Sequence, residues 1–255
     1  MVHSTAIIHP RAQIGANCEI GPYCIIGEHV TLGDGCKLHS HVVIDGHTKL
    51  GKENEIFPFA SLGLRTQDLK WKGGVTHVEI GDRNIFREGV TIHSATSDGG
   101  TTIVGSNNVL LTYVHIAHDC RLGNGIIMSG FAGMAGHVVI EDNVVLGGYV
   151  AVHQFCRIGR LSMVGGCSKL RQDLAPFMLA DGSPAETHTI NKIGLERHGI
   201  PEGTITALKQ AYKILFREGL TIPNALAKME NELPTLPEIK YLAEFVRASE
   251  RGISK

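Results

Sequence analysis

Aliphatic residues recur at every sixth position over most of the chain. From residue 104 to 164 the series is unbroken, and a small or compact residue follows four places after each of its members. Its members are Val104, Leu110, Ile116, Leu122, Met128, Met134, Ile140, Leu146, Val152, Ile158 and Val164. A period of six fits neither the roughly 3.6-residue period of a helix nor the alternation of an ordinary strand. It is a hexapeptide repeat, which indicates a repeat architecture.

Each hexad of such a repeat forms one short strand and a corner, and three hexads close one triangular coil. Successive coils stack as parallel strands about 4.8 Å apart, and the aliphatic and compact residues fill the inside. Glycine is common at corners because it tolerates unusual backbone angles. The pattern therefore predicts a mainly β protein, a parallel β-helix shaped as a triangular prism. The period by itself does not give the handedness.

An earlier series with the same period begins almost at the first residue. It consists of Ile8, Ile14, Ile20, Ile26, Leu32, Leu38, Ile44, Leu50, Ile56 and Leu62. The pattern lapses near 64–79, resumes at Ile80, and lapses again near 95–102. We interpret both lapses as loops extruded from the prism. Functional side chains often sit on loops held by a rigid scaffold, so both loops are candidate walls of a site.

The period fails after Ser168, and apolar residues from Pro201 onward follow a helical spacing instead. A first helix would bury Ile205, Leu208, Ala211, Tyr212 and Leu215, and a second would bury Ile222, Leu226, Met229 and Leu233. A third would start near Thr235, with Pro237 in its first turn. We therefore predict a β-helix domain over 1–185. Residues 186–255 would form a connector and an α-helical C-terminal domain.

Composition narrows the function classes. The formal net charge is -1 with both signs interspersed, which gives no case for nucleic-acid binding or for an anionic membrane surface. The region after Met1 lacks the basic, apolar and cleavage-site succession of a secretory signal. The apolar run over 125–139 keeps the hexad period, which explains it better than a membrane span. We expect a cytoplasmic protein without membrane insertion.

The cysteines are predicted to be core residues. Five of the six occupy the inward compact position of a hexad, namely Cys18, Cys24, Cys36, Cys120 and Cys156, and no CxxC motif is present. Cys18 and Cys36 lie one coil apart, which is within disulfide reach, but a cytoplasmic setting would keep them reduced.

Polar residues gather on one ridge of the predicted prism. On an 18-residue coil, positions that differ by 18 lie one above another, so Gly136 lies over His118 and Gln154 lies over Gly136. A single corner histidine would simply meet solvent, but the whole set indicates a site because corner side chains point away from the core. The other members of this column are His115, Asp119, His137 and His153.

The column combines the groups that acyl transfer requires. Imidazole titrates near neutral pH and is a natural general base, and Asp119 could hold its tautomer. Gly136 has no side chain, so its N–H could donate to a developing oxyanion. A base and an oxyanion donor indicate acyl transfer to a hydroxyl or an amine. A metal site is the alternative: His115, His118 and His137 could bind zinc, as three histidines do in trimeric β-helix carbonic anhydrases.

Several strings of the sequence carry a family resemblance. They are Gln67-Asp68-Leu69-Lys70, His115-Ile116-Ala117-His118-Asp119-Cys120, Ala135-Gly136-His137, Ala151-Val152-His153-Gln154-Phe155-Cys156 and Val164-Gly165-Gly166-Cys167-Ser168. Together with the repeats and the helical tail, they resemble the cytoplasmic UDP-N-acetylglucosamine acyltransferases that open lipid A biosynthesis in Gram-negative bacteria. The resemblance implies a left-handed β-helix, a homotrimer and sites between neighbouring prisms. It implies no cofactor.

The resemblance also implies roles for single residues. His118, oriented by Asp119, would take the proton of the sugar 3-hydroxyl as this attacks the thioester of a 3-hydroxyacyl chain on acyl carrier protein. The Gly136 N–H would hold the oxyanion. The residues that would position the sugar, the phosphates and the nucleotide are Asp68, Lys70, His115, His137, His153, Gln154, Asn191 and Arg197.

Met163 and Gly166 match the positions that line the acyl groove in this family. Because Gly166 leaves room, we expect a long rather than a medium acyl chain. The sequence departs from the familiar family pattern at Pro184, Ile193 and His198. These departures leave the nucleotide contacts and the acceptor open, since some relatives acylate a 3-amino analogue of UDP-N-acetylglucosamine and form an amide.

Two further hypotheses compete with this acyltransferase. The N-acyltransferase that acts later in the same pathway shares the prism, but it carries a uridine-binding domain before its repeats, and here the hexads begin by Ile8. A non-catalytic repeat scaffold would bind partners along flat faces. It predicts no catalytic column.

Overall fold

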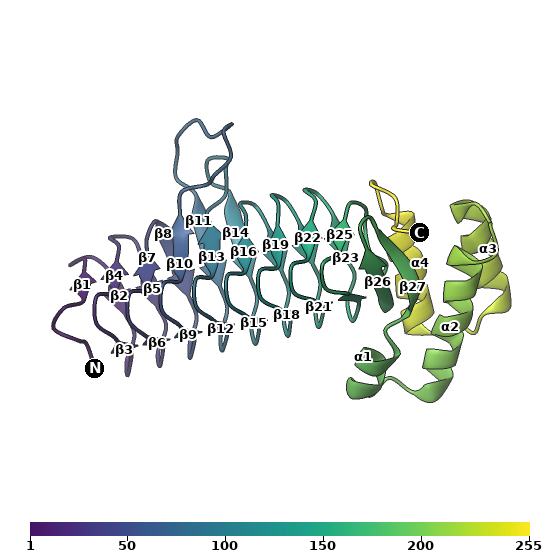
Figure 1. Cartoon of the computed structure of the whole chain (residues 1–255), viewed down its shortest axis with the longest axis horizontal. Coiled ribbons are helices and arrows are strands. Elements are labelled where there is room, and N and C mark those ends of the chain that lie inside the picture. Colours follow the sequence, from purple (N-terminus) through teal and green to yellow (C-terminus); the bar gives the residue numbers. More distant parts are fainter.

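The computed structural model describes all 255 residues. It is a long left-handed parallel β-helix, followed by a β-hairpin and four helices (Figure 1). Very short strands follow one another at the hexad spacing and sort into three parallel sheets, one for each side of the prism. The predicted fold class is confirmed.

The first sheet contains β1 (Ile7–Ile8), β4 (Ile25–Ile26), β7 (Val43–Ile44), β10 (Ser61–Leu64), β13 (Thr91–His93), β16 (His115–Ile116), β19 (Gly133–Met134), β22 (Ala151–Val152) and β25 (Lys169–Leu170). The second contains β2 (Gln13–Ile14), β5 (Thr31–Leu32), β8 (His47–Leu50), β11 (His77–Ile80), β14 (Thr101–Val104), β17 (Arg121–Leu122), β20 (Val139–Ile140) and β23 (Arg157–Ile158). The third contains β3 (Glu19–Ile20), β6 (Lys37–Leu38), β9 (Glu55–Ile56), β12 (Ile85–Phe86), β15 (Val109–Leu110), β18 (Ile127–Met128), β21 (Val145–Leu146), β24 (Met163–Val164), β26 (Met178–Gly182) and β27 (Ala185–Ile190).

The strand register confirms the 18-residue coil. His115 pairs with Gly133, and Gly133 pairs with Ala151, so each step is 18 residues. Two coils are longer: Ser61 pairs with Thr91, a step of 30, and Thr91 pairs with His115, a step of 24. These coils therefore carry 12 and 6 extra residues, which form the two predicted loops at 65–76 and 94–100.

Both loops leave the prism at the same edge. Each one follows a strand of the first sheet, β10 or β13, and leads into a strand of the second sheet, β11 or β14. His118 and Asp119 lie between β16 and β17, at the corner of this edge in the following coil. The loops project beside this part of the prism in Figure 1, so the column predicted from stacking continues upward into them.

The inside of the prism holds the residues that the repeat predicts. One hydrophobic cluster of 63 buried residues runs through the coils and into the helices. Cys18, Cys24, Cys36, Cys120 and Cys156 are buried in it as free thiols, which confirms their interpretation as core residues. Burial raises the pKa of Cys120 to about 12, as expected of a thiol without an opposite charge beside it.

The three predicted helices are present as α2 (Glu202–Phe216), α3 (Ile222–Glu232) and α4 (Pro237–Arg247). The predicted connector is more regular than we expected, because it contains β27 and the short helix α1 (Lys192–Arg197). β27 pairs antiparallel with β26, and β26 pairs with β24 of the prism. This hairpin crosses residue 185, so the division of the chain there stays a prediction. None of the helices combines the length and apolar character that crossing a bilayer requires.

Candidate functional site

The site is built around His118 and Asp119. The Nδ1 of His118 lies 2.8 Å from Oδ2 of Asp119, and both side chains are largely buried. Asp119 adopts the left-handed backbone conformation, with a φ of +61°. At this corner the conformation brings the carboxylate alongside the ring that precedes it. An ionised carboxylate accepts only, so the hydrogen bond requires a proton on Nδ1 and leaves Nε2 as the basic nitrogen.

The second loop and the adjoining strand hold Asp119 in place. The backbone N–H of Thr96 donates to Asp119 Oδ2 over 3.1 Å, and the Asp119 N–H donates to Oγ1 of Thr102 over 2.8 Å. Both contacts reach across from the preceding coil. The carboxylate that orients His118 is therefore itself fixed, which limits the rotation of the imidazole.

The first loop closes over the other side of His118. Asp68 Oδ2 lies 3.9 Å from His118 Nε2, and the backbone N–H of Lys70 donates to the Asp68 carboxylate over 2.9 Å. The loops are tied to each other, because the hydroxyls of Thr66 and Thr96 lie 2.9 Å apart. A carboxylate beside Nε2 stabilises the ring once it has taken a proton.

Gly136 lies directly under the His118 ring. A Cβ at this position would be 2.2 Å from Cε1 and 2.6 Å from Nε2 of His118, so no larger residue fits while the ring keeps its place. The residue is buried, and its N–H donates to no atom of the chain. At corresponding corners of other coils the same N–H is paired: that of Asn124 donates to Asp142 Oδ1 over 2.7 Å. A buried donor without a partner indicates a place for a ligand oxygen.

Two further histidines lie beside the catalytic corner. The His115 Nδ1 lies 2.7 Å from the Thr91 hydroxyl, and burial, with the nearby His118, lowers the pKa of His115. His93 packs edge-on against His115, with ring centroids 5.4 Å apart. Burial, together with the neighbouring His115 and His118, lowers the pKa of His93 to about 4. Both rings are therefore neutral at neutral pH, so they add no positive charge beside His118.

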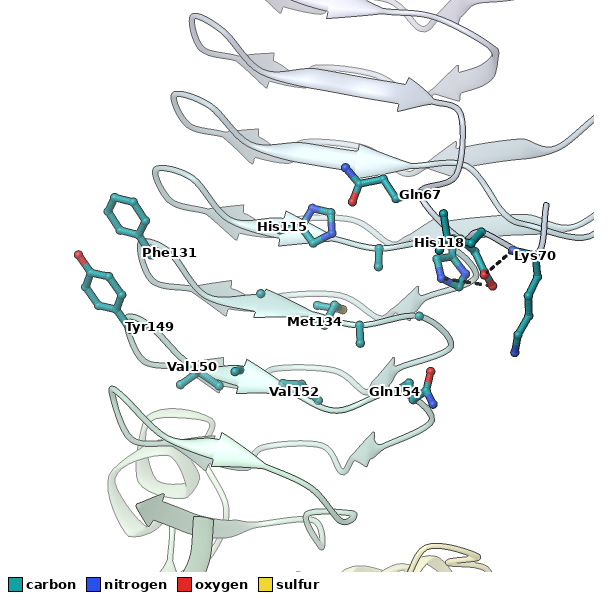
Figure 2. Close-up of a pocket in the computed structure, with 17 residues that line it drawn as sticks. Gln67, Lys70, His115, His118, Phe131, Met134, Tyr149, Val150, Val152 and Gln154 are labelled. Atoms are coloured by element: carbon teal, nitrogen blue, oxygen red, sulfur yellow. Dashed lines mark hydrogen bonds and ion pairs between the residues drawn. The ribbon is translucent and has the colours of Figure 1, made fainter. Parts of the chain in front are cut away.

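These groups open onto a cleft of about 850 Å³ on the outside of the first sheet. Figure 2 shows His118 and Lys70 at one side of it, Phe131 and Tyr149 at the opposite side, and His115 between them. The floor is made of small residues, among them Gly133 and Ala151. The cleft is wide enough for a ligand larger than a sugar ring, since it spans the whole face of the sheet.

The structure brings together most of the predicted site residues. Six of them line the cleft, namely Asp68, Lys70, His115, His118, Gly136 and Gln154. Asp119 lies behind His118, and the Nε2 of His137 is 3.7 Å from Asp119 Oδ2. His153 precedes Gln154 and is exposed.

Four predicted residues lie elsewhere in the chain. Asn191 caps α1, accepting from Gly194 N over 3.1 Å, and its Nδ2 donates to Leu161 O over 2.9 Å. Arg197 ends α1 and is exposed, as are Ile193 and His198 of the same segment. Met163 is on the outside of the third sheet, and Gly166 follows it at an exposed corner. None of these residues lines the cleft of its own chain.

Sequence reasoning missed the supporting residues of the site. Thr66, Thr96 and Thr102 hold the loops and Asp119, and His93 supports His115. Stacking arithmetic could not place them, because the lengths of the two inserted loops were unknown. Once the steps of 30 and 24 residues are counted, Thr91 falls directly over His115.

The structure also changes the candidate metal ligands. The atoms that could bind one ion belong to His118, Asp119 and His137, and they lie within 4.8 Å of one another. His115 is not part of this group, because its Nδ1 is next to Thr91. The predicted set of three histidines does not form.

Comparisons with known proteins agree with this architecture. A family model described as UDP-N-acetylglucosamine O-acyltransferase, domain 2, matches residues 173–254, and one for bacterial transferase hexapeptide repeats matches residues 1–33 and 11–46. An acyl-[acyl-carrier-protein]–UDP-N-acetylglucosamine O-acyltransferase of Thermodesulfovibrio yellowstonii is 49% identical over 255 residues, which is 100% of this chain and 99% of the relative.

Solved structures agree as well. The UDP-N-acetylglucosamine acyltransferase of Bacteroides fragilis matches with a TM-score of 0.98 at 42% identity, covering 100% of both chains. That of Moraxella catarrhalis matches with a TM-score of 0.95 at 42% identity, covering 100% of this chain and 99% of the other. With full-length identity at this level, the chain belongs to the family of acyl-[acyl-carrier-protein]–UDP-N-acetylglucosamine O-acyltransferases.

Proposed function

We propose that this protein transfers a 3-hydroxyacyl chain from acyl carrier protein to the 3-hydroxyl of UDP-N-acetylglucosamine, the first step of lipid A biosynthesis. Family membership supports the reaction and both substrates. The observation that carries the mechanism is the position of the His118 ring over the unpaired N–H of Gly136. A base and an oxyanion donor are thus neighbours in one cleft.

The proton moves through His118 in both directions. Nε2 takes the proton of the 3-hydroxyl while its oxygen forms a bond to the thioester carbon. The carbonyl oxygen becomes an oxyanion and accepts from the Gly136 N–H. The tetrahedral intermediate then expels the thiolate of the carrier's prosthetic group, which takes the proton from Nε2 and leaves as a thiol. Asp119 stabilises the imidazolium that exists between the two transfers.

A panel of donors and acceptors tests the reaction. Acyl carrier protein thioesters of several chain lengths are offered against UDP-N-acetylglucosamine and its 3-amino analogue. We expect an ester product from the first acceptor, and His118→Ala should lower kcat by about 10²- to 10⁴-fold, the usual contribution of a general base. Normal turnover by His118→Ala with an intact oligomer would refute the assignment of the base.

The same panel decides the alternative acceptor. An amine at the 3-position would present the same proton to Nε2 and form an amide, so the geometry of the site serves both reactions. Pro184 lies at the turn of the hairpin, while Ile193 and His198 lie on or next to α1, outside the cleft of this chain. A strong preference for the 3-amino analogue would move the proposal to amide formation.

The outer face of the third sheet supports a homotrimer. Its outward residues between β12 and β26 are all apolar: Ile85, Val109, Ile127, Val145, Met163 and Leu179. At about 4.8 Å per coil they form a stripe roughly 24 Å long, which we call the apolar stripe. Such a stripe on a rigid face is typical of a surface that another chain covers.

A neighbouring copy would also complete the site. Met163 and Gly166, which we propose for the acyl groove, and Asn191 and Arg197, which we propose for the nucleotide, are absent from the cleft of their own chain. They can act at a site with His118 only if a second chain supplies them. The proposed trimer, with sites between neighbouring prisms, satisfies this requirement.

A zinc-dependent activity is the second candidate, because His118, Asp119 and His137 converge. In this structure Asp119 Oδ2 is bonded to His118 Nδ1, and both atoms would have to separate to bind an ion. Metal analysis of the purified protein separates the two functions, and stoichiometric zinc with metal-dependent turnover would favour the second. The cytoplasmic location stays a prediction.

A further inference from the structure

The last residues of the chain return to the prism next to His153. The segment after α4, residues 248–255, which we call the C-terminal tail, forms a parallel bridge between Ile253 and Asp173. Ser254 N donates to Asp173 O over 2.8 Å, and Asp173 N donates to Gly252 O over 3.0 Å. The tail is therefore fixed to the coil directly below His153 and Gln154.

The buried carboxylate of Asp173 secures this attachment. Its Oδ1 accepts from Arg157 N, and its Oδ2 accepts from the Ser249 hydroxyl, each over 2.7 Å. Asp173 is only 1% exposed, so both bonds are shielded from water. Gln172 adds a third tie, because its side-chain amide donates to Arg251 O over 3.1 Å. The position of Arg251 is thus determined from both sides.

The guanidinium of Arg251 reaches the imidazole of His153. Its Nη2 donates to Arg171 O over 3.1 Å and lies 3.3 Å from His153 Nδ1. The backbone oxygen of Gln154 lies 3.2 Å from the same Nδ1. These two contacts of Nδ1 need opposite proton positions, since the guanidinium only donates and the carbonyl only accepts.

We infer that Arg251 is a positioning residue that holds His153 in the neutral tautomer with its proton on Nε2. A charge-assisted hydrogen bond is about twice as strong as a neutral one, so the contact with the guanidinium prevails over the contact with the Gln154 carbonyl. A proton on both nitrogens would place an imidazolium against a guanidinium. His153 Nε2 makes no hydrogen bond within the chain, so its N–H is free to donate to an oxygen of the acceptor.

This assignment gives the two ends of the column opposite tasks. His118 carries its proton on Nδ1 and offers Nε2 as a base, whereas His153 carries its proton on Nε2 and offers a donor. The inference rests on the proposed function for its substrate, an oxygen-rich sugar nucleotide. The tautomer itself depends only on Arg251.

The direct test is the protonation state of His153 by nitrogen-15 NMR of histidine-labelled protein, with the resonance identified by its loss in His153→Ala. In the wild type we expect a protonated Nε2 and an unprotonated Nδ1. In Arg251→Met the Gln154 carbonyl becomes the only partner of Nδ1, so the proton should move there. A protonated Nδ1 in the wild type would overturn the inference, even if the methionine variant does not fold.

Kinetics supply the second readout. Arg251→Met should raise the KM for UDP-N-acetylglucosamine about tenfold, the effect of one lost hydrogen bond, with kcat within about twofold. Arg251→Lys, which keeps a charged donor, should recover part of the loss. In a His153→Ala background Arg251→Met should add nothing, because Arg251 acts through that ring.

Ser249→Ala is the matched control, since it loosens the tail at Asp173 without touching His153. It should keep the wild-type tautomer and KM. An equal rise in KM in Ser249→Ala, or an additive effect in the His153→Ala background, would show that Arg251 only anchors the tail. If the wild type acylates no acceptor of the panel, the proposed function fails while the tautomer still decides on Arg251.

Discussion

The contact between Gly136 and His118 gives the sharpest prediction. In Gly136→Ala the new Cβ would lie 2.2 Å from Cε1 of His118. Carbon atoms in contact are about 3.5 to 4.0 Å apart, so the ring must move by roughly 1.3 to 1.8 Å. Gly136 has no left-handed φ, so alanine causes no backbone strain, and the whole effect falls on the imidazole.

The ring cannot move without loss. Its Nδ1 is tied to Asp119, which is held by Thr96 and Thr102, so a displaced imidazole either breaks this bond or carries Nε2 away from the acceptor hydroxyl. A misplacement of about 1 Å can cost about 100-fold in rate. We expect kcat to fall by at least about 100-fold, which corresponds to about 2.7 kcal/mol in the barrier.

The assay is turnover at saturating donor and acceptor, with thermal unfolding measured in parallel. Gly130→Ala is the control, because it also adds a methyl at a corner glycine of the same coil, where the nearest atom is Thr112 O at 3.3 Å. It should change kcat little. If Gly136→Ala kept kcat within about threefold of the wild type, the ring over Gly136 would not be the working position of the base.

Four further predictions follow from the same structure. Lys70→Ala should raise the KM for the acceptor about tenfold, because a charge beside the diphosphate is lost, and a change confined to the KM of the donor would remove Lys70 from the nucleotide site. Gly166→Met should shift donor preference toward shorter chains in competition assays, while an unchanged profile would argue against its place in the groove. Ile127→Glu puts a charge in the middle of the apolar stripe and should yield monomers in analytical ultracentrifugation, with turnover lost together with the trimer. Stability should fall as the pH drops from 6.5 to 4, because burial lowers the pKa of His93 to about 4 and the unfolded chain binds that proton first. The 2.5-unit gap is worth about 3 kcal/mol at pH 4, and His93→Leu should flatten this part of the denaturation midpoint profile.

The repeat made the prism predictable, because a strict six-residue period fixes both the inward residues and the 18-residue register. His118, Gly136 and Gln154 could be placed in one column for the same reason. The helices α2, α3 and α4 were predictable from apolar spacing over 11 to 15 residues, long enough to show a period. The hairpin of β26 and β27 was missed, since short polar strands with a bulge carry no such signal.

Contacts between distant segments could not be predicted at all. Arg251 and His153 are 98 positions apart and belong to different kinds of structure, so no period relates them. Asn191 shows the opposite difficulty. The resemblance implies a nucleotide contact, whereas in its own chain both ends of its amide are engaged in capping α1 and in bonding Leu161 O.

The two loops at the catalytic edge add whole hexads, 12 residues and 6, and the strands on either side keep their pairing. An edge of this kind behaves like a socket with a fixed thread: segments of different length can be exchanged while the barrel beneath them stays the same. Substrate choice in such a protein can diversify by replacing what is plugged in above His118, without any change to the interior that keeps the base aligned.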